Sequence, residues 1–341
     1  GTNPHWPIPY NPWDKQQHRV PGGSSAGAPV SLLTHSCQLA LGTDTSGSVR
    51  VPAAMCGTFG IKTSTGRWDK QNIVPLSPSI DSAGLLARTA ADALWGFAVM
   101  DPVSCDDPQA LITQLQQPLS SDLQGIRIGY IPDYFADCED GIDNVVMAAL
   151  AQLSKAGATL VELAWPGLEE SWQLFVDGGL SDVEFPEFIF AAENKRWLDS
   201  LAATTKLRFL HLQGTPADVF ADLIRSRNQQ VSNMQHAAHA CLSQVDFAVC
   251  PTVPISPPLV AQVNGNLDVY RERNMRALSH TQLANYQNLC AATLPVGLNQ
   301  QGFPCGLQII MPHGEDIELL KWCLLVEKIL GVMPKPDLQC S

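Results

Sequence analysis

Two serines near the start of the chain, Ser24 and Ser48, each lie in a glycine-rich segment. Residues 21–27 read Pro-Gly-Gly-Ser-Ser-Ala-Gly, and residues 42–52 read Gly-Thr-Asp-Thr-Ser-Gly-Ser-Val-Arg-Val-Pro. Because glycine reaches positive φ and permits close backbone approach, N–H groups in such loops can converge on one point. A hydroxyl at that point has donors ready to stabilise an oxyanion. One such loop is typical of a surface turn, whereas the pair at this spacing favours nucleophilic catalysis.

The composition describes a large, apolar and acidic protein. The 341 residues are 45% hydrophobic and 16% charged, which is enough for a sizeable core and too apolar for disorder. The formal net charge of −12 argues against direct nucleic-acid binding and gives no attraction to an anionic membrane surface. A small neutral or cationic ligand fits this charge better than a polyanion does.

The ten cysteines are scattered along the chain without any Cys-x-x-Cys spacing. Several lie in apolar runs such as residues 245–250, which favours buried reduced thiols over a disulfide framework. No glycosylation sequon, signal peptide or membrane-spanning apolar run is visible, so we expect a cytoplasmic protein. The eight histidines show no metal-ligand spacing, and the sequence predicts neither a metal nor a cofactor.

Strand and helix signals alternate along most of the chain, which predicts an α/β fold with a largely parallel or mixed sheet. Strands are expected at residues 38–42, 125–131, 158–163, 246–250, 294–298 and 306–310. Helices are expected at residues 26–37, 142–156, 283–292 and 316–330. Residues 166–230 differ, being aromatic-rich and mostly helical in pattern, and we interpret them as a variable insertion or cap within one domain.

The serine segments belong to an ordered series of motifs that resembles the amidase signature family. That family has a Gly-Gly-Ser-Ser-Gly loop, then Gly-Thr-Asp-x-Gly-Gly-Ser-Ile-Arg-x-Pro-Ala, then Cys-Gly-x-x-Gly-x-Lys-Pro-Thr. Here the third motif stands at residues 56–64 as Cys-Gly-Thr-Phe-Gly-Ile-Lys-Thr-Ser. Residues 77–84 and 87–92 also look like the family's next segments. The resemblance is strong over residues 1–92 and thin over residues 165–240.

The resemblance implies an amidase signature fold, in which a mixed β-sheet core is covered by helices on both faces (α/β/α). It also implies a Ser-Ser-Lys triad that hydrolyses or transfers amides. Mapped onto this sequence, Ser48 is the nucleophile and Ser24 is the bridging serine, held by a cis peptide bond after Gly23. The chain would then be a single amidase-signature domain over residues 1–341 that lacks its N-terminal portion.

The remaining site residues follow from the same mapping and from their neighbours. The resemblance implies an oxyanion hole made by the amides of Thr45, Ser46, Gly47 and Ser48. We expect Asp44 and Arg50, which flank the nucleophile, to form a buried or partly buried ion pair that braces the loop, with solvated charges as the alternative. Ser25 is interpreted as a supporting hydroxyl near the loop.

The chemistry of these groups is consistent with that mapping. A serine hydroxyl is a poor nucleophile until a base takes its proton, and a second hydroxyl can relay that proton to a neutral lysine. Backbone amides then stabilise the tetrahedral oxyanion, each donor being worth about 3–4 kcal/mol.

The sequence departs from the family pattern at three points. Ser46 and Ala26 stand where the family usually has glycine, and a non-glycine residue at position 46 is strained if its φ is positive. The family's lysine base lies further upstream of the Gly-Gly-Ser-Ser loop than the residues that precede Ser24 here. Lys62 matches a different family lysine. Either the chain is part of a longer protein or it has lost its base.

Four functions remain open at this point. The first is a stand-alone amidase that hydrolyses a small carboxamide, either alone or as a homodimer. The second is the glutaminase subunit of a tRNA amidotransferase, which needs a partner protein to hold the tRNA. The third is a catalytically inactive amidase-like protein. The fourth is an α/β-hydrolase with Ser25 in a Gly-x-Ser-x-Gly elbow, but the polar residues 11–18 are unlike the strand that must precede that elbow.

Overall fold

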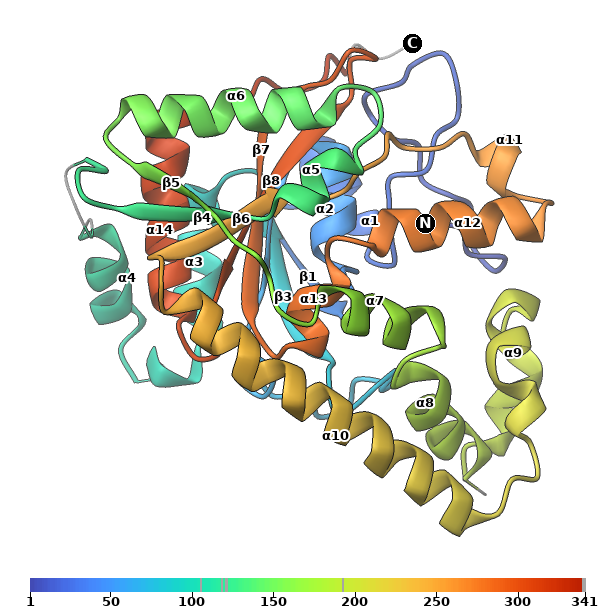
Figure 1. The fold of residues 1–341 in the computed structure, drawn as a ribbon. Helices are drawn as coiled ribbons and strands as arrows, with labels where there is room; N and C mark the ends of the chain where they lie inside the picture. Colours follow the sequence, from blue (N-terminus) through green and yellow to red (C-terminus); the bar gives the residue numbers. More distant parts are fainter. Residues whose placement is uncertain (105, 118, 120–121, 192, 339–341) are drawn as a thin grey trace.

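An eight-stranded mixed sheet forms the centre of the molecule (Figure 1). The computed structural model describes residues 1–104, 106–117, 119, 122–191 and 193–338. The strands are β1 (Leu39–Asp44), β2 (Phe59–Lys62), β3 (Ser82–Ala87), β4 (Arg127–Tyr130), β5 (Thr159–Glu162), β6 (Phe247–Pro251), β7 (Cys290–Leu298) and β8 (Pro304–Met311). Their order across the sheet is β1-β3-β2-β7-β8-β6-β4-β5. Strand β4 pairs in parallel with β5 and β6, and the other pairs are antiparallel.

Helices cover both faces of this sheet (Figure 1), so the expected α/β/α arrangement is confirmed. One face carries α3 (Ala90–Met100), α4 (Pro108–Gln116), α6 (Ile142–Lys155) and α14 (Asp316–Leu330). The other carries α1 (Gly27–Leu33), α2 (Arg50–Cys56), α5 (Pro132–Ala136), α13 (Gln282–Tyr286) and the end of α10 (Ala217–Leu242). The catalytic candidates lie on this second face.

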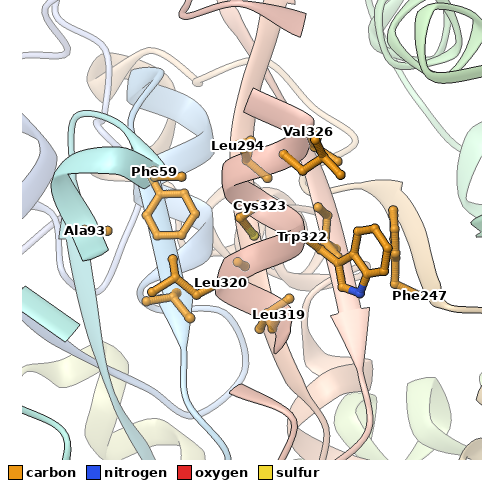
Figure 2. Close-up of a cluster of buried hydrophobic side chains, with 14 of the residues drawn as sticks. Phe59, Ala93, Phe247, Leu294, Leu319, Leu320, Trp322, Cys323 and Val326 are labelled. Atoms are coloured by element: carbon orange, nitrogen blue, oxygen red, sulfur yellow. The ribbon is translucent and has the colours of Figure 1, made fainter. Parts of the chain in front are cut away.

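The largest core cluster fills the space between the sheet and α14 (Figure 2). Leu319, Leu320 and Cys323 of α14 are inaccessible to solvent, and Trp322 packs on Phe247 of β6 with ring centroids 5.2 Å apart. Full burial of a leucine side chain contributes about 1.5–3 kcal/mol. These apolar contacts with α14 therefore stabilise the sheet that carries the two serine loops.

The remaining helices lie to one side of the sheet and along its second face. They are α7 (Leu168–Val176), α8 (Ser181–Phe190), α9 (Ala203–Phe209), α11 (Val260–Val263) and α12 (Leu267–Leu278), with short 3-10 turns at Lys195–Ser200 and Leu210–Leu212. A third 3-10 turn, Pro102–Ser104, connects α3 to α4 and packs against both. In Figure 1, α8, α9 and the first turns of α10 project away from the sheet. These elements fall within residues 166–230, whose role as a cap stays a prediction.

Most elements expected from the sequence are present, and one is wrong. Helix α14 has the expected bounds and α6 falls one residue short of them. A helix was expected over residues 283–292, but α13 ends at Tyr286 and β7 begins at Cys290. Asn288 adopts a positive φ of 52°, which breaks the helix. The alanines that follow pair with strands on both sides, so tertiary pairing overrides their helix propensity.

Every cysteine that the structure describes is free, and six of them are buried. Cys105 and Cys340 lie outside the described residues. Within the described ranges, none of the helices is long and apolar enough to cross a membrane.

Candidate active site

The two serine loops meet directly at the backbone. Ser48 follows the end of β1, and Ser24 precedes α1. The amide of Ser25 donates a 3.1 Å hydrogen bond to the carbonyl of Ser48, so the loops are joined at the residues of interest. The Gly23–Ser24 peptide bond is cis. Ser24 is exposed and Ser48 is half-buried, which leaves both hydroxyls within reach of a small ligand.

Four successive amides in the second loop are available to an anionic group. In the part of the chain that the structure describes, the N–H groups of residues 45–48 donate to no protein acceptor. Buried donors are normally paired, so a run of unpaired donors beside a candidate nucleophile is the expected form of an oxyanion hole.

The backbone of this loop suits its sequence. Gly47 has a φ of 136°, a conformation that favours glycine. Ser46 does not have a positive φ, because the non-glycine residues with positive φ among those described are His35, Asn72, Asp140 and Asn288. The family's glycine at position 46 is therefore replaced here without backbone strain. Ala26 has right-handed helical angles, which an alanine adopts freely.

Asp44 and Arg50 form an ion pair beneath the loop, and neither side chain is accessible to solvent. Arg50 Nη2 donates to Asp44 Oδ1 at 2.8 Å and Arg50 Nε donates to Asp44 Oδ2 at 3.1 Å. The amides of Val49 and Arg50 also donate to this carboxylate. Burial disfavours the charged carboxylate, but Arg50, Lys62 and Asn285 together outweigh it and lower the pKa of Asp44. The pair ties the start of the loop to the start of α2.

Arg50 uses its remaining donors on the last third of the chain. Its Nη1 donates to the Thr281 carbonyl at 2.8 Å and to Gln308 Oε1 at 2.6 Å. Its Nη2 donates to Asn285 Oδ1 at 2.6 Å. Asn285 in turn donates to the carbonyl and the carboxylate of Asp44, both at 3.0 Å. The loop that contains Ser48 is thus anchored to α13 and β8.

A second chain of hydrogen bonds connects the loop to α8. Thr45 Oγ1 donates to Asp81 Oδ1 at 2.6 Å, and Asp81 also accepts from the amides of Leu76 and Ser77. Burial raises the pKa of Asp81, with the hydrogen bond from Thr45 opposing it. The hydroxyl of Ser77 donates to Glu184 of α8 at 2.6 Å. The position of α8 is therefore coupled to the residues beside Thr45.

Lys62 lies under the same network and is not accessible to solvent. Its ammonium donates to the carbonyls of Thr63 at 2.8 Å and Leu289 at 2.9 Å. Burial, reinforced by the charge of Arg50, lowers its pKa to about 8. Because its donors are directed to these two carbonyls, Lys62 has a structural position beneath the loop.

Several residues of this site were missed at the sequence level. They are Asp81, Glu184, Thr281, Asn285 and Gln308. Asp81 lies in a segment that resembles the family, so a signal existed for it. Gln308 ends a segment, residues 303–308, that also resembles the family, although more weakly. The others are single polar residues in or beside helices, and nothing in their spacing indicates which loop they contact. Among the described residues, no group of three or more His, Cys, Asp or Glu side chains could hold a metal ion.

Comparison with known proteins places this chain in a family. The family model described as Amidase matches residues 1–320. The 2-amino-5-chloromuconic acid deaminase of Comamonas testosteroni is 38% identical over 99% of this chain and 71% of its own length. A glutamyl-tRNA(Gln) amidotransferase subunit from Thermosynechococcus vestitus is 31% identical over 88% of this chain and 65% of its own length.

Solved structures agree in fold. The 6-aminohexanoate cyclic dimer hydrolase in complex with its substrate superposes with a TM-score of 0.79 at 21% identity, over 98% of this chain and 73% of the other. The corresponding glutamyl-tRNA(Gln) amidotransferase subunit from Thermotoga maritima gives 0.75 at 24% identity, over 98% and 72%. At these identities the likeness shows the fold, and the family model carries the assignment. The chain belongs to the amidase family, whose reaction is hydrolysis of a C–N bond in an amide.

Proposed function

We propose that Ser48 is the nucleophile of this hydrolase and that Ser24 relays its proton. The observation that carries the proposal is the run of unpaired amides at residues 45–48 beside the Ser25–Ser48 backbone hydrogen bond. Ser48 Oγ attacks the amide carbonyl carbon, and the carbonyl oxygen becomes an oxyanion that those amides stabilise.

The proton of Ser48 passes to Ser24 and from there to a lysine. Lys62 donates to two carbonyls and Lys70 donates to the carbonyls of Pro78 and Asp81, so we assign neither of them as that base. The same proton then returns to the leaving nitrogen as the C–N bond breaks. Water hydrolyses the resulting acyl-enzyme by the reverse of this path. The products are a carboxylic acid and ammonia or an amine.

The substrate we propose is a small carboxamide. The acidic net charge is unfavourable for a polyanionic substrate, and the exposed Ser24 leaves room for a compact one. A second candidate is release of ammonia from an unsaturated amino acid, since the deaminase relative covers nearly the whole chain at 38% identity. The glutaminase half-reaction of a tRNA amidotransferase is a third, supported by relatives such as the 31% identical Thermosynechococcus protein; this would require partner proteins.

One experiment tests the catalytic assignment without knowledge of the substrate. The protein is treated with a fluorophosphonate, and the adduct is located by mass spectrometry. We expect the adduct on Ser48 in the wild type and none in Ser48→Ala. An adduct on Ser25 would overturn the assignment in favour of an α/β-hydrolase elbow, and the absence of any adduct would favour an inactive homologue.

The three substrates separate in one assay of ammonia release. Simple primary amides, 2-aminomuconic acid and glutamine are each offered at equal concentration to the wild type and to Ser48→Ala. Turnover of primary amides alone supports the amidase proposal. Glutamine turnover that rises with a co-purifying partner would identify a component of an amidotransferase. Preference for 2-aminomuconic acid would identify a deaminase.

A further inference from the structure

We infer that Thr281 is a positioning residue that aims the Gly47 amide at the developing oxyanion. This inference rests on the proposed role of Ser48. Thr281 precedes α13, and the residue it contacts in the loop lies 235 positions earlier in the chain. Its hydroxyl donates a 2.6 Å hydrogen bond to the carbonyl of Ser46, which is the shortest of the contacts that Thr281 Oγ1 makes.

The direction of one carbonyl fixes the direction of the next amide. In a planar trans peptide, the C=O of one residue and the N–H of the next point to opposite sides. The Ser46 carbonyl is held toward Thr281, so the Gly47 N–H is directed away from Thr281. That amide is one of the unpaired donors at residues 45–48. A rotation of the Ser46–Gly47 peptide would break the hydrogen bond to Thr281 and turn the donor away from the oxyanion at once.

Thr281 and the loop lie so close together that a side chain at position 47 would collide with Thr281. A Cβ built on Gly47 would lie 2.1 Å from Thr281 Oγ1 and 2.7 Å from Thr281 Cβ. The positive φ of Gly47 favours glycine there, and a side chain at this position would also require Thr281 or the loop to shift. Thr281 therefore packs directly against the loop at Gly47.

Thr281 is itself held on its other side. Its carbonyl accepts a 2.8 Å hydrogen bond from Arg50, and its amide donates to the Leu278 carbonyl at 3.2 Å. The residue is inaccessible to solvent. A group that is fixed before the reaction stabilises charge without reorganising during it, which is the condition under which an oxyanion hole works best. The hydroxyl thus acts through the peptide and does not touch the substrate.

Two substitutions separate the hydroxyl from the shape of the side chain. Thr281→Val keeps the volume and removes the donor, whereas Thr281→Ser keeps the donor and removes a methyl group. The probe is a fluorophosphonate, whose phosphoryl oxygen takes the oxyanion position when Ser48 attacks phosphorus and fluoride leaves. Removal of one oxyanion donor typically costs about 10²–10³ in rate, so a misdirected donor should cost about 10–100-fold.

We expect Thr281→Val to lower the maximal rate of labelling by that factor with little change in the concentration for half-maximal labelling. Thr281→Ser should recover most of the rate. The pH dependence of labelling should keep its inflection in both variants, because the proton relay is untouched. Equal rates in Thr281→Val and the wild type would overturn the inference, as would a loss that serine does not rescue.

Folding defects and failure of the catalytic assignment are recognised separately. The urea midpoint of each variant is measured first, and Thr281→Ala replaces the valine variant if that one does not fold. If Ser48→Ala still becomes labelled, the proposed nucleophile is wrong, and the positioning role assigned to Thr281 falls with it. If Ser48 is required and Thr281→Val labels normally, only the positioning role is lost.

Discussion

Arg50 and Asp44 face one another beneath the loop that contains Ser48, with both side chains at 0% exposure and joined by two side-chain hydrogen bonds. Each group also has further partners, so neither charge is left unpaired. A buried pair of this kind costs desolvation energy when it forms, yet removing one partner leaves the other charge stranded. The pair therefore serves the geometry of the loop more than the overall stability.

Arg50→Met should lower the free energy of unfolding by about 3–5 kcal/mol and abolish turnover, because Asp44 would lose its largest favourable interaction. Urea denaturation measures the first effect. Arg225→Met is the matched control, since its pair with Asp222 is 76% and 71% exposed. That control should change stability by less than about 1 kcal/mol. Similar losses in the two variants would contradict the structural role assigned to Arg50.

Ser48→Ala and Ser24→Ala should each reduce turnover by at least about 10³-fold, as expected for groups that act as a unit. Both side chains are small and at least partly exposed, so the urea midpoints should stay close to that of the wild type. Ser25→Ala is the control within the same loop. Its hydroxyl lies over Gly42, and we expect it to keep most of the activity. A Ser25 variant as inactive as the Ser48 variant would argue for the wrong nucleophile.

Gly47→Ala should abolish activity and destabilise the protein, because the added methyl group would collide with Thr281. Gly66→Ala provides the comparison. Gly66 also has a positive φ, 84°, but nothing lies within 4 Å of its Cβ position. Its substitution measures backbone strain alone, about 1–2 kcal/mol, and should leave turnover intact. If the two variants behaved alike, the contact with Thr281 would have no functional weight.

Lys62→Met should alter how stability depends on pH. The pKa of Lys62 is lowered from 10.5 to about 8 by burial, so the unfolded state binds this proton more tightly than the folded state. As the pH rises from 8 to 10.5, deprotonation removes that penalty and stabilises the wild type relative to the variant. The difference in unfolding free energy should shift by roughly 2–3 kcal/mol between about pH 7 and about pH 10. Parallel urea titrations test this, and a difference independent of pH would mean that Lys62 titrates normally.

The sequence was sufficient for the fold class, whereas the catalytic roles of the two serine loops stay a prediction. Helix α14 and most strands follow from periodicity and breakers, and the two serine loops follow from glycine content. The helix expected across residues 283–292 failed because pairing on both sides of β7 decided its structure. Thr281 and Glu184 could not be found, since their importance depends on contacts with residues 235 and 107 positions away.

Those long separations have a consequence for synthesis of the chain. Arg50 finds its partners 231, 235 and 258 residues further along. The loop that contains Ser48 is translated well before its anchors on α13 and β8. A nascent chain that has not yet reached Gln308 therefore carries Ser48 without all the contacts that shape the surrounding loop. We therefore expect the loop to take its final shape only after β8 has been made.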